Sequence, residues 1–184
     1  MNFPDSEFWN YSVQLFQIPE VENQCLSLQD NYNADVNVLL CCCWAAEQAI
    51  ELNVDDIQSL VETSRPWQTS IIGPIRDTRR LMKQNVMAMP SQMTDDTLDK
   101  LREMELNAEH MAQLALEKAV REHPQPTADD ISTVECATRN SLRYLQQLDN
   151  DTDINNATQN LSALLEAIYQ DSESIQVALM DSVD

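Results

Sequence analysis

Residues 38–46 form an apolar run without interruption, and polar side chains return only at Glu47 and Gln48. A segment this apolar has to be buried on nearly all sides, because no face of it meets water at low cost. The apolar run is too short to span a bilayer, which requires roughly 20 apolar residues. We therefore predict that a helix from Asp35 to about Leu52 lies at the centre of a helical protein.

The rest of the composition supports an all-α fold. The chain of 184 residues contains one glycine, Gly73, whereas all-β folds use glycine at many turns. Glycine-rich phosphate loops are excluded for the same reason. We expect one irregular bundle of six to eight helices over residues 1–170, followed by an acidic, frayed tail over residues 171–184, in which Ile175 to Met180 could pack weakly.

Capping residues and prolines divide the chain into helices. We expect helix starts at Asp5 or Ser6, Pro19, Asp35, Asn53–Asp56, Ser64–Pro66 and Thr94. Gly73 and Pro74 should kink or restart a helix, and residues 87–92 should be a linker. The longest helix should end near Glu122. Two more helices are expected over residues 127–148 and from about Ile154 to Ile168.

The net charge of −20, from 31 acidic and 11 basic residues, limits the class of partner. Free nucleic acid and anionic membranes are disfavoured because both require a basic surface. Basic proteins are favoured partners, although acidity also keeps a cytosolic protein in solution. The five cysteines are expected to be buried thiols in a reducing cytoplasm. The N-terminus lacks the features of a signal peptide, so we expect a cytoplasmic protein.

Basic residues are concentrated in one segment. Residues 1–64 contain no Lys or Arg, and five of the 11 basic residues then occur at Arg65, Arg76, Arg79, Arg80 and Lys83. Two interpretations are open. Acidic helices hold this segment internally, or it forms an exposed face that binds anions.

Charged residues interrupt the apolar stripes of two helices. The stripe through Leu101 and Ala108 places Glu105 at a core position, with Glu109 one turn later, and a second stripe places Arg79 at a core position. An isolated buried charge costs several kcal/mol, so we predict that Arg79 or a neighbouring arginine contacts Glu105 or Glu109. The pair is either an internal ion pair that fixes helix register, a polar pocket for an anion, or a partly exposed pair without a role.

Asp30, Asp35 and Asn37 flank the start of the central helix. They act as helix caps, or they join Arg76, Arg79, Arg80, Glu105 and Glu109 in one polar cluster. No catalytic residue is indicated. We predict no metal site and no cofactor, because the two histidines lack metal-binding spacing and acidic residues are too abundant for their proximity to be informative.

Several motifs resemble those of a small family of cytosolic proteobacterial proteins, a domain of unknown function. They are Phe8-Trp9, the segment from Cys25 to Asp30, the segment from Asp35 to Leu40, Pro66-Trp67, Pro74-Ile75-Arg76 with Arg79-Arg80, and the segment from Glu105 to Glu109. The resemblance covers residues 8–115. It implies a cytosolic bacterial protein and no particular activity, cofactor or partner.

Three functions are compatible with these features. The first is an acidic adaptor that binds a basic protein. The second is a small-molecule-binding protein or enzyme with a pocket of Arg and Glu side chains, and the third is mimicry of nucleic-acid charge. A closed, fully paired cluster would favour the adaptor, and an open cavity with unpaired arginines would favour the pocket.

Overall fold

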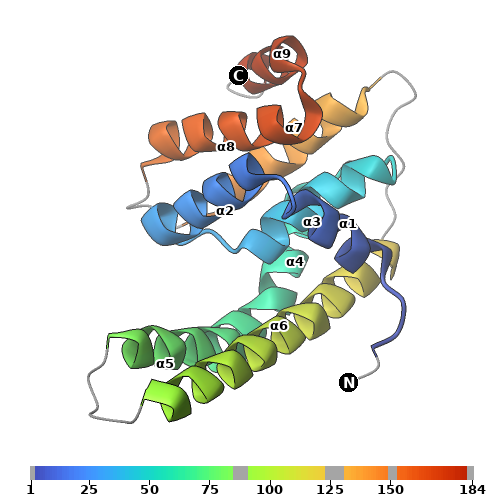
Figure 1. Cartoon of the computed structure of the whole chain (residues 1–184). Helices are drawn as coiled ribbons and strands as arrows, with labels where there is room; N and C mark the ends of the chain where they lie inside the picture. Colours follow the sequence, from blue (N-terminus) through green and yellow to red (C-terminus); the bar gives the residue numbers. More distant parts are fainter. Residues whose placement is uncertain (1–2, 85–90, 123–130, 149–152, 182–184) are drawn as a thin grey trace.

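The computed structural model describes residues 3–84, 91–122, 131–148 and 153–181 (Figure 1). These residues form α-helices and one π-helical turn, η1, and they contain no β-strand. The elements follow in the order α1 (Glu7–Leu15), α2 (Pro19–Tyr32), α3 (Val36–Glu47), α4 (Val54–Trp67), η1 (Gln68–Ile72), α5 (Gly73–Lys83), α6 (Ser91–Glu122), α7 (Thr133–Leu145), α8 (Ile154–Tyr169) and α9 (Ser172–Asp181).

Elements α4, η1 and α5 follow one another without a break, so they form one continuous helical rod. Counted in this way, the described residues fold into eight rods, and the predicted all-α irregular bundle is confirmed. None of the helices in these residues combines the length and the apolarity needed to cross a membrane.

The apolar segment lies at the centre, as predicted. Helix α3 contacts α1, α2, α4, α6 and α7 (Figure 1), and ten consecutive residues from Asn37 to Ala46 are buried. The Asp35 side chain caps α3 by accepting a hydrogen bond from the Asn37 backbone N–H. The helix ends at Glu47 rather than near Leu52, since Ala49 adopts a positive φ of 55° that no helix accommodates.

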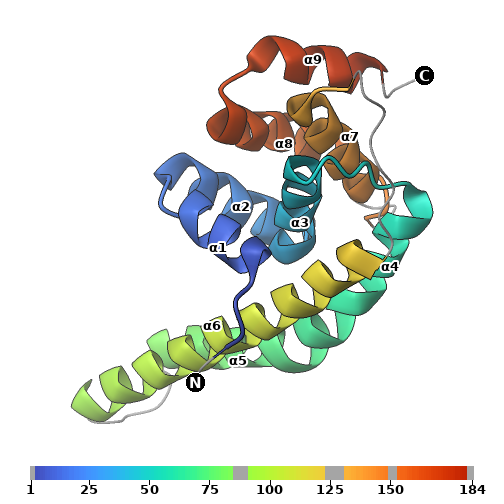
Figure 2. The same ribbon diagram turned by 90° about the vertical axis from the view of Figure 1, so that its right-hand side faces the viewer.

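The rod of α4, η1 and α5 lies along α6 (Figure 2). The predicted helix start at Ser64–Pro66 is wrong: Pro66 lies inside α4, and the chain widens into η1 just after it. Proline removes one hydrogen bond within the helix, yet the chain stays helical through η1 and into α5. α5 then begins at Gly73, where we expected a kink or restart, without leaving helical backbone angles.

Helix α6 begins at Ser91, three residues before the predicted cap Thr94, and ends at Glu122 as predicted. Of the predicted linker 87–92, residues 87–90 lie outside the described residues. The buried stripe contains Glu105, Ala108 and Ala112, as expected, and then continues through Leu116 and Val120. The predicted stripe followed alternating steps of three and four residues along the helix. A straight α-helix drifts away from that repeat, so the buried positions in its second half lie four residues apart.

The C-terminal region is more ordered than expected. Helix α7 begins at Thr133, capped by Ser132, and residues 127–130 of its predicted range lie outside the described residues. The expectation of a frayed tail fails for α9, which packs against α7 and α8 and fully buries Ile175 and Ala178. The division of the chain at residue 170 stays a prediction.

Candidate functional site

An ionic cluster joins α5 to α6, as the interrupted stripes predicted. Arg76 donates from Nε to Glu105 Oε1 at 2.8 Å and from Nη2 to Glu109 Oε1 at 2.9 Å. Arg79 donates from Nε to Glu105 Oε2 at 2.6 Å. Glu105 is thus shared by two arginines, and we call these four residues the Arg/Glu cluster.

Both arginines of the cluster are engaged. The remaining terminal nitrogen of Arg76, Nη1, donates to the side-chain carbonyl of Gln29 on α2 at 2.8 Å. The three nitrogens of Arg76 therefore each have an acceptor, and Arg79 donates a second bond to Glu105 Oε1 at 3.2 Å. The arrangement holds Arg76 and Arg79 internally, and it leaves these two arginines poorly placed to take an anion. The other basic residues of the segment, Arg65, Arg80 and Lys83, are exposed.

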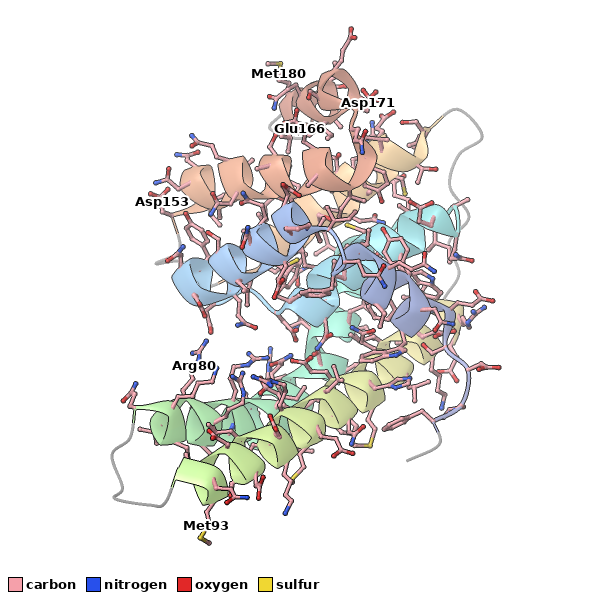
Figure 3. All side chains as sticks on the ribbon, in the orientation of Figure 1. Arg80, Met93, Asp153, Glu166, Asp171 and Met180 are labelled. Atoms are coloured by element: carbon pink, nitrogen blue, oxygen red, sulfur yellow. The ribbon has the colours of Figure 1, made fainter. Side chains whose placement is uncertain are left out.

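Arg80 and Asp30 lie at the edge of this region. Figure 3 shows Arg80 reaching from α5 toward α2, where its Nη2 meets Asp30 Oδ1 at 3.0 Å. Both side chains are about half exposed, at 50% and 53%. An exposed pair of this kind contributes roughly 0.2–1 kcal/mol, so it adds little to stability.

Asp35 and Asn37 form a second hydrogen-bond network next to the Arg/Glu cluster, in which the donors are uncharged groups. Asp35 caps α3 and also accepts hydrogen bonds from the Ser64 hydroxyl and from Gln68 Nε2, at 2.9 Å for the latter. Asn37 Oδ1 accepts from Gln113 Nε2 at 2.7 Å. Both interpretations therefore hold in part: Asp35 caps the helix, Asn37 binds Gln113 instead of capping, and both lie beside the Arg/Glu cluster.

A cavity of about 490 Å³ opens between α1, α2, α3 and α6. Its outer wall is apolar, and Val13, Phe16, Leu26 and Leu106 there are exposed large hydrophobic residues. Its polar lining residues come from six elements: Ser12, Gln17, Gln29, Asn37, Gln68, Arg76, Glu105, Glu109 and Gln113. We call this space the α1–α6 cavity.

Two of its lining side chains are buried with unpartnered polar atoms. Ser12 Oγ and Gln113 Oε1 have no hydrogen-bond partner within the described part of the chain, although these residues are only 2% and 3% exposed. A buried polar atom without a partner costs about 1–3 kcal/mol, and such atoms in native proteins call for an explanation. Neither atom has appreciable accessible surface, so a group held in the cavity does not reach either of them.

The surroundings of the two carboxyl groups in the cluster shift their pKa values in opposite directions. Burial raises the pKa of Glu105, but hydrogen bonds and charge from Arg79 and Arg76 outweigh it, and the pKa ends below its ordinary value. Burial dominates at Glu109 and raises its pKa, which the single contact with Arg76 does not reverse. Burial likewise raises the pKa of Asp35.

Sequence patterns found the charged members of this region and the uncharged Asn37, but they missed the other uncharged ones. Gln29, Ser64, Gln68 and Gln113 carry hydrogen bonds there, yet polar uncharged residues fall on both faces of helices throughout this chain. One signal was available for Gln113: it lies one turn beyond Glu109 on the same helix.

All five cysteines are free and buried, as predicted. In the ranges that the structure describes, no group of three or more His, Cys, Asp or Glu side chains is arranged to hold a metal ion.

Comparison with known proteins returns a family model and nothing else. No curated protein and no solved structure matches the chain. The family model, described as "Protein of unknown function (DUF2390)", matches residues 7–116. Every residue that lines the α1–α6 cavity, from Trp9 to Gln113, falls within this match, as do all four members of the Arg/Glu cluster. The chain belongs to the DUF2390 family of proteins.

Proposed function

We propose that this protein is a non-enzymatic adaptor that docks a basic protein partner at the α1–α6 cavity. One observation carries the proposal: the arginines beside the cavity are engaged by internal acceptors, so the site presents carboxylate and amide groups. In a chain of net charge −20, such a site attracts cationic rather than anionic partners.

The rim of the cavity gives the partner a surface to pack against. Phe16, Leu26 and Leu106 are exposed by 38%, 43% and 52%. Exposed apolar side chains that surround a polar floor are typical of protein interaction sites. The adaptor would work in a reducing cytoplasm, where its five buried cysteines stay as thiols.

A low-salt pulldown from the native cell tests this proposal. Leu106→Arg places a positive charge and extra bulk on the rim. Met104→Arg makes the same kind of change on the same helix at a residue of similar exposure, 54%, that does not line the cavity. We expect the wild type and Met104→Arg to retain the same basic protein and Leu106→Arg to lose it.

Two results would contradict the adaptor. One is the absence of any basic protein in the low-salt eluate of the wild type. The other is equal retention by Leu106→Arg and Met104→Arg, which would separate binding from the cavity. Loss of the retained protein on raising salt is also expected, since exposed charges more than about 10 Å apart are screened at 0.1 M.

A small-molecule site is the second candidate, and the size of the cavity favours it. Ligand pockets commonly measure about 300–1,000 Å³, and this one measures about 490 Å³. Any such ligand has to tolerate engaged arginines and supply hydrogen-bond donors. A thermal-shift screen of metabolites, with Leu106→Arg as the blocked control, would reveal it as stabilisation of the wild type alone.

A further inference from the structure

The walls of the α1–α6 cavity follow the spacing of a helix. Its lining residues on α1 and α6 recur every three or four positions and are Trp9, Ser12, Val13, Phe16 and Gln17 on α1, and Glu105, Leu106, Glu109 and Gln113 on α6. Each set covers two turns, which span about 12 Å at 1.5 Å per residue. A partner helix presents its own side chains at the same spacing, so two of its turns match the length of each wall.

Apolar side chains from three helices surround the opening of the cavity. Val13 and Phe16 of α1, Leu26 of α2 and Leu106 of α6 line the cavity and are all exposed. Exposed apolar residues that occur singly are ordinary, whereas a group of them around one concave space marks an interaction site. The rim therefore favours an occupant with an apolar face.

The size of the cavity decides which part of the occupant enters it. The space measures about 490 Å³. Two turns of a helix about 10 Å across and 12 Å long occupy roughly 900 Å³, so the space does not hold a helix backbone. It holds apolar side chains that project from a helix lying across the rim.

Unpartnered carboxylates lie beside the apolar rim. Glu22 precedes Leu26 by one turn of α2, and Glu103 precedes Leu106 by three residues on α6. Both carboxylates are exposed, and neither forms a hydrogen bond or an ion pair with another described residue. Two negative charges on different helices are therefore open to basic side chains of a partner.

The basic residues nearest to the rim are already compensated. Arg102, on the same helix as Leu106, pairs with Asp99 at 3.4 Å. Arg80 of α5 pairs with Asp30 of α2 at 3.0 Å. The charge left without a partner beside the rim is thus negative, and it complements lysine or arginine side chains.

We propose that the α1–α6 cavity binds an amphipathic α-helix with a bulky apolar face flanked by lysine or arginine. Its apolar side chains, four residues or one turn apart, enter the cavity and pack against Phe16, Leu26 and Leu106. Its basic side chains reach Glu22 and Glu103 on the outer surface. The helix belongs to the basic partner, so this inference rests on the proposed function.

Other occupants fit the same observations less well. An extended peptide has no sheet edge to join, because the described residues contain no β-strand. A phosphorylated or acidic peptide would find Arg76 and Arg79 already engaged. A second copy of this chain would bring together two molecules of net charge −20, with unpartnered carboxylates beside the contact.

The test titrates the full ¹⁵N-labelled chain with a synthetic peptide at physiological ionic strength. The peptide has 14 leucine and lysine residues, with leucine at helical spacing and both ends blocked. A diastereomer with four lysines in the D form keeps the composition and charge but disfavours the right-handed helix. A second matched probe replaces every lysine with glutamate.

We expect the all-L lysine peptide to give saturable amide shifts at α1 and α6. The ¹³Cα shifts of the bound, labelled peptide should be those of a helix. Both matched probes should bind at least about tenfold more weakly, which corresponds to about 1.4 kcal/mol.

One pair of variants tests the apolar rim. Leu26→Lys places a charge among the apolar side chains at a residue that is 43% exposed. Leu81→Lys makes the same change at an exposed residue of α5 that does not line the cavity. Leu26→Lys should weaken binding of the peptide at least about tenfold, and Leu81→Lys should bind as the wild type does.

A second pair tests the flanking charge. The double variant Glu22→Lys/Glu103→Lys reverses both carboxylates beside the rim and should weaken binding at least about tenfold. Glu47→Lys/Glu62→Lys makes the same change in net charge at exposed residues that do not line the cavity, and it should bind nearly as the wild type does. Thermal melting of each variant establishes that it is folded.

The results separate this inference from the proposed function. Equal affinity for the all-L peptide and its D-lysine diastereomer would overturn the inference, and so would unchanged affinity in both Leu26→Lys and Glu22→Lys/Glu103→Lys. If a basic protein were still lost from Leu106→Arg in that case, the adaptor would stand and the helix would not. Peptide binding without any retained protein would keep the helix site and remove the adaptor.

Discussion

Among single residues, Glu105 has the largest expected influence on stability. Its carboxylate is 9% exposed and holds both Arg76 and Arg79. Replacing Glu105 with alanine leaves two poorly exposed guanidinium groups without their main partner, and breaking buried pairs in this way costs about 3 kcal/mol. Urea unfolding should show this loss in Glu105→Ala. Glu103→Ala, exposed on the same helix, should stay within about 0.5 kcal/mol, and equal midpoints for the two variants would contradict the prediction.

Glu105 should also contribute to loss of stability in acid. Its pKa is lower in the folded protein than in the unfolded chain, so it stabilises the fold above the unfolded pKa, about 4.3. That contribution disappears as the pH falls through the lower, folded pKa. Glu109 acts with the opposite sign, but it is present in both proteins compared. Unfolding free energies of the wild type and Glu105→Gln should therefore converge as the pH falls below about 5. Parallel pH profiles would rule this out.

Charged and uncharged members of the site differed in how far the sequence could predict them. Glu105 interrupts an apolar stripe, and burial of a charge forces a partner, so its pairing with an arginine followed from the sequence. The sequence did not show which arginine lies at the centre of the Arg/Glu cluster. Arg76 and Arg79 are one turn apart on the same helix and differ only in their tertiary position. Gln29 and Gln113 produce no comparable interruption, and their roles depend on where α2 and α3 dock.

Among the elements, the turn that joins α4 to α5 depends on Gly73. A Cβ atom at this position would lie 2.6 Å from the backbone oxygen of Gln68, although φ is an ordinary −54°. Alanine normally favours a helix by up to about 1 kcal/mol over glycine, but here the clash with backbone should win and cost about 1–3 kcal/mol. The melting temperature of Gly73→Ala should fall. A rise would show that η1 relaxes into a regular α-helix without loss.

Helix α9 gives a second prediction at this scale. Ile175 is fully buried against the core, whereas Val177 on the same helix is 54% exposed. Truncation of a buried isoleucine to alanine costs about 2–5 kcal/mol, and truncation of an exposed valine costs little. Chemical unfolding of Ile175→Ala and Val177→Ala should reproduce that difference. Equal stability of the two variants would mean that α9 is not stably packed and is frayed, as the composition of the tail indicated.

Helix existence was more predictable than helix boundaries. Apolar periodicity and caps located α1, α2, α3, α6 and α8, because those signals are local. Pro66 was misread as a helix start, since proline is common in the first turn of a helix, whereas here it lies inside α4, shortly before η1. The apolar residues between Ile175 and Met180 indicated only weak packing of the tail, because the order of α9 depends on contacts with α7 and α8 that a local pattern does not reveal.

For the whole molecule, two electrostatic effects oppose each other, and salt distinguishes them. The excess of acidic residues, 31 against 11 basic ones, destabilises the compact state through repulsion between exposed carboxylates. The ion pairs of Arg76 and Arg79 favour it, but these side chains are only 15% and 19% exposed and are weakly screened. Screening should therefore relieve repulsion more than it weakens the pairs. We expect the melting temperature to rise by about 2 °C or more between low and physiological ionic strength, whichever monovalent salt is used. A fall would mean that internal pairing, rather than surface repulsion, dominates the electrostatics of the folded chain.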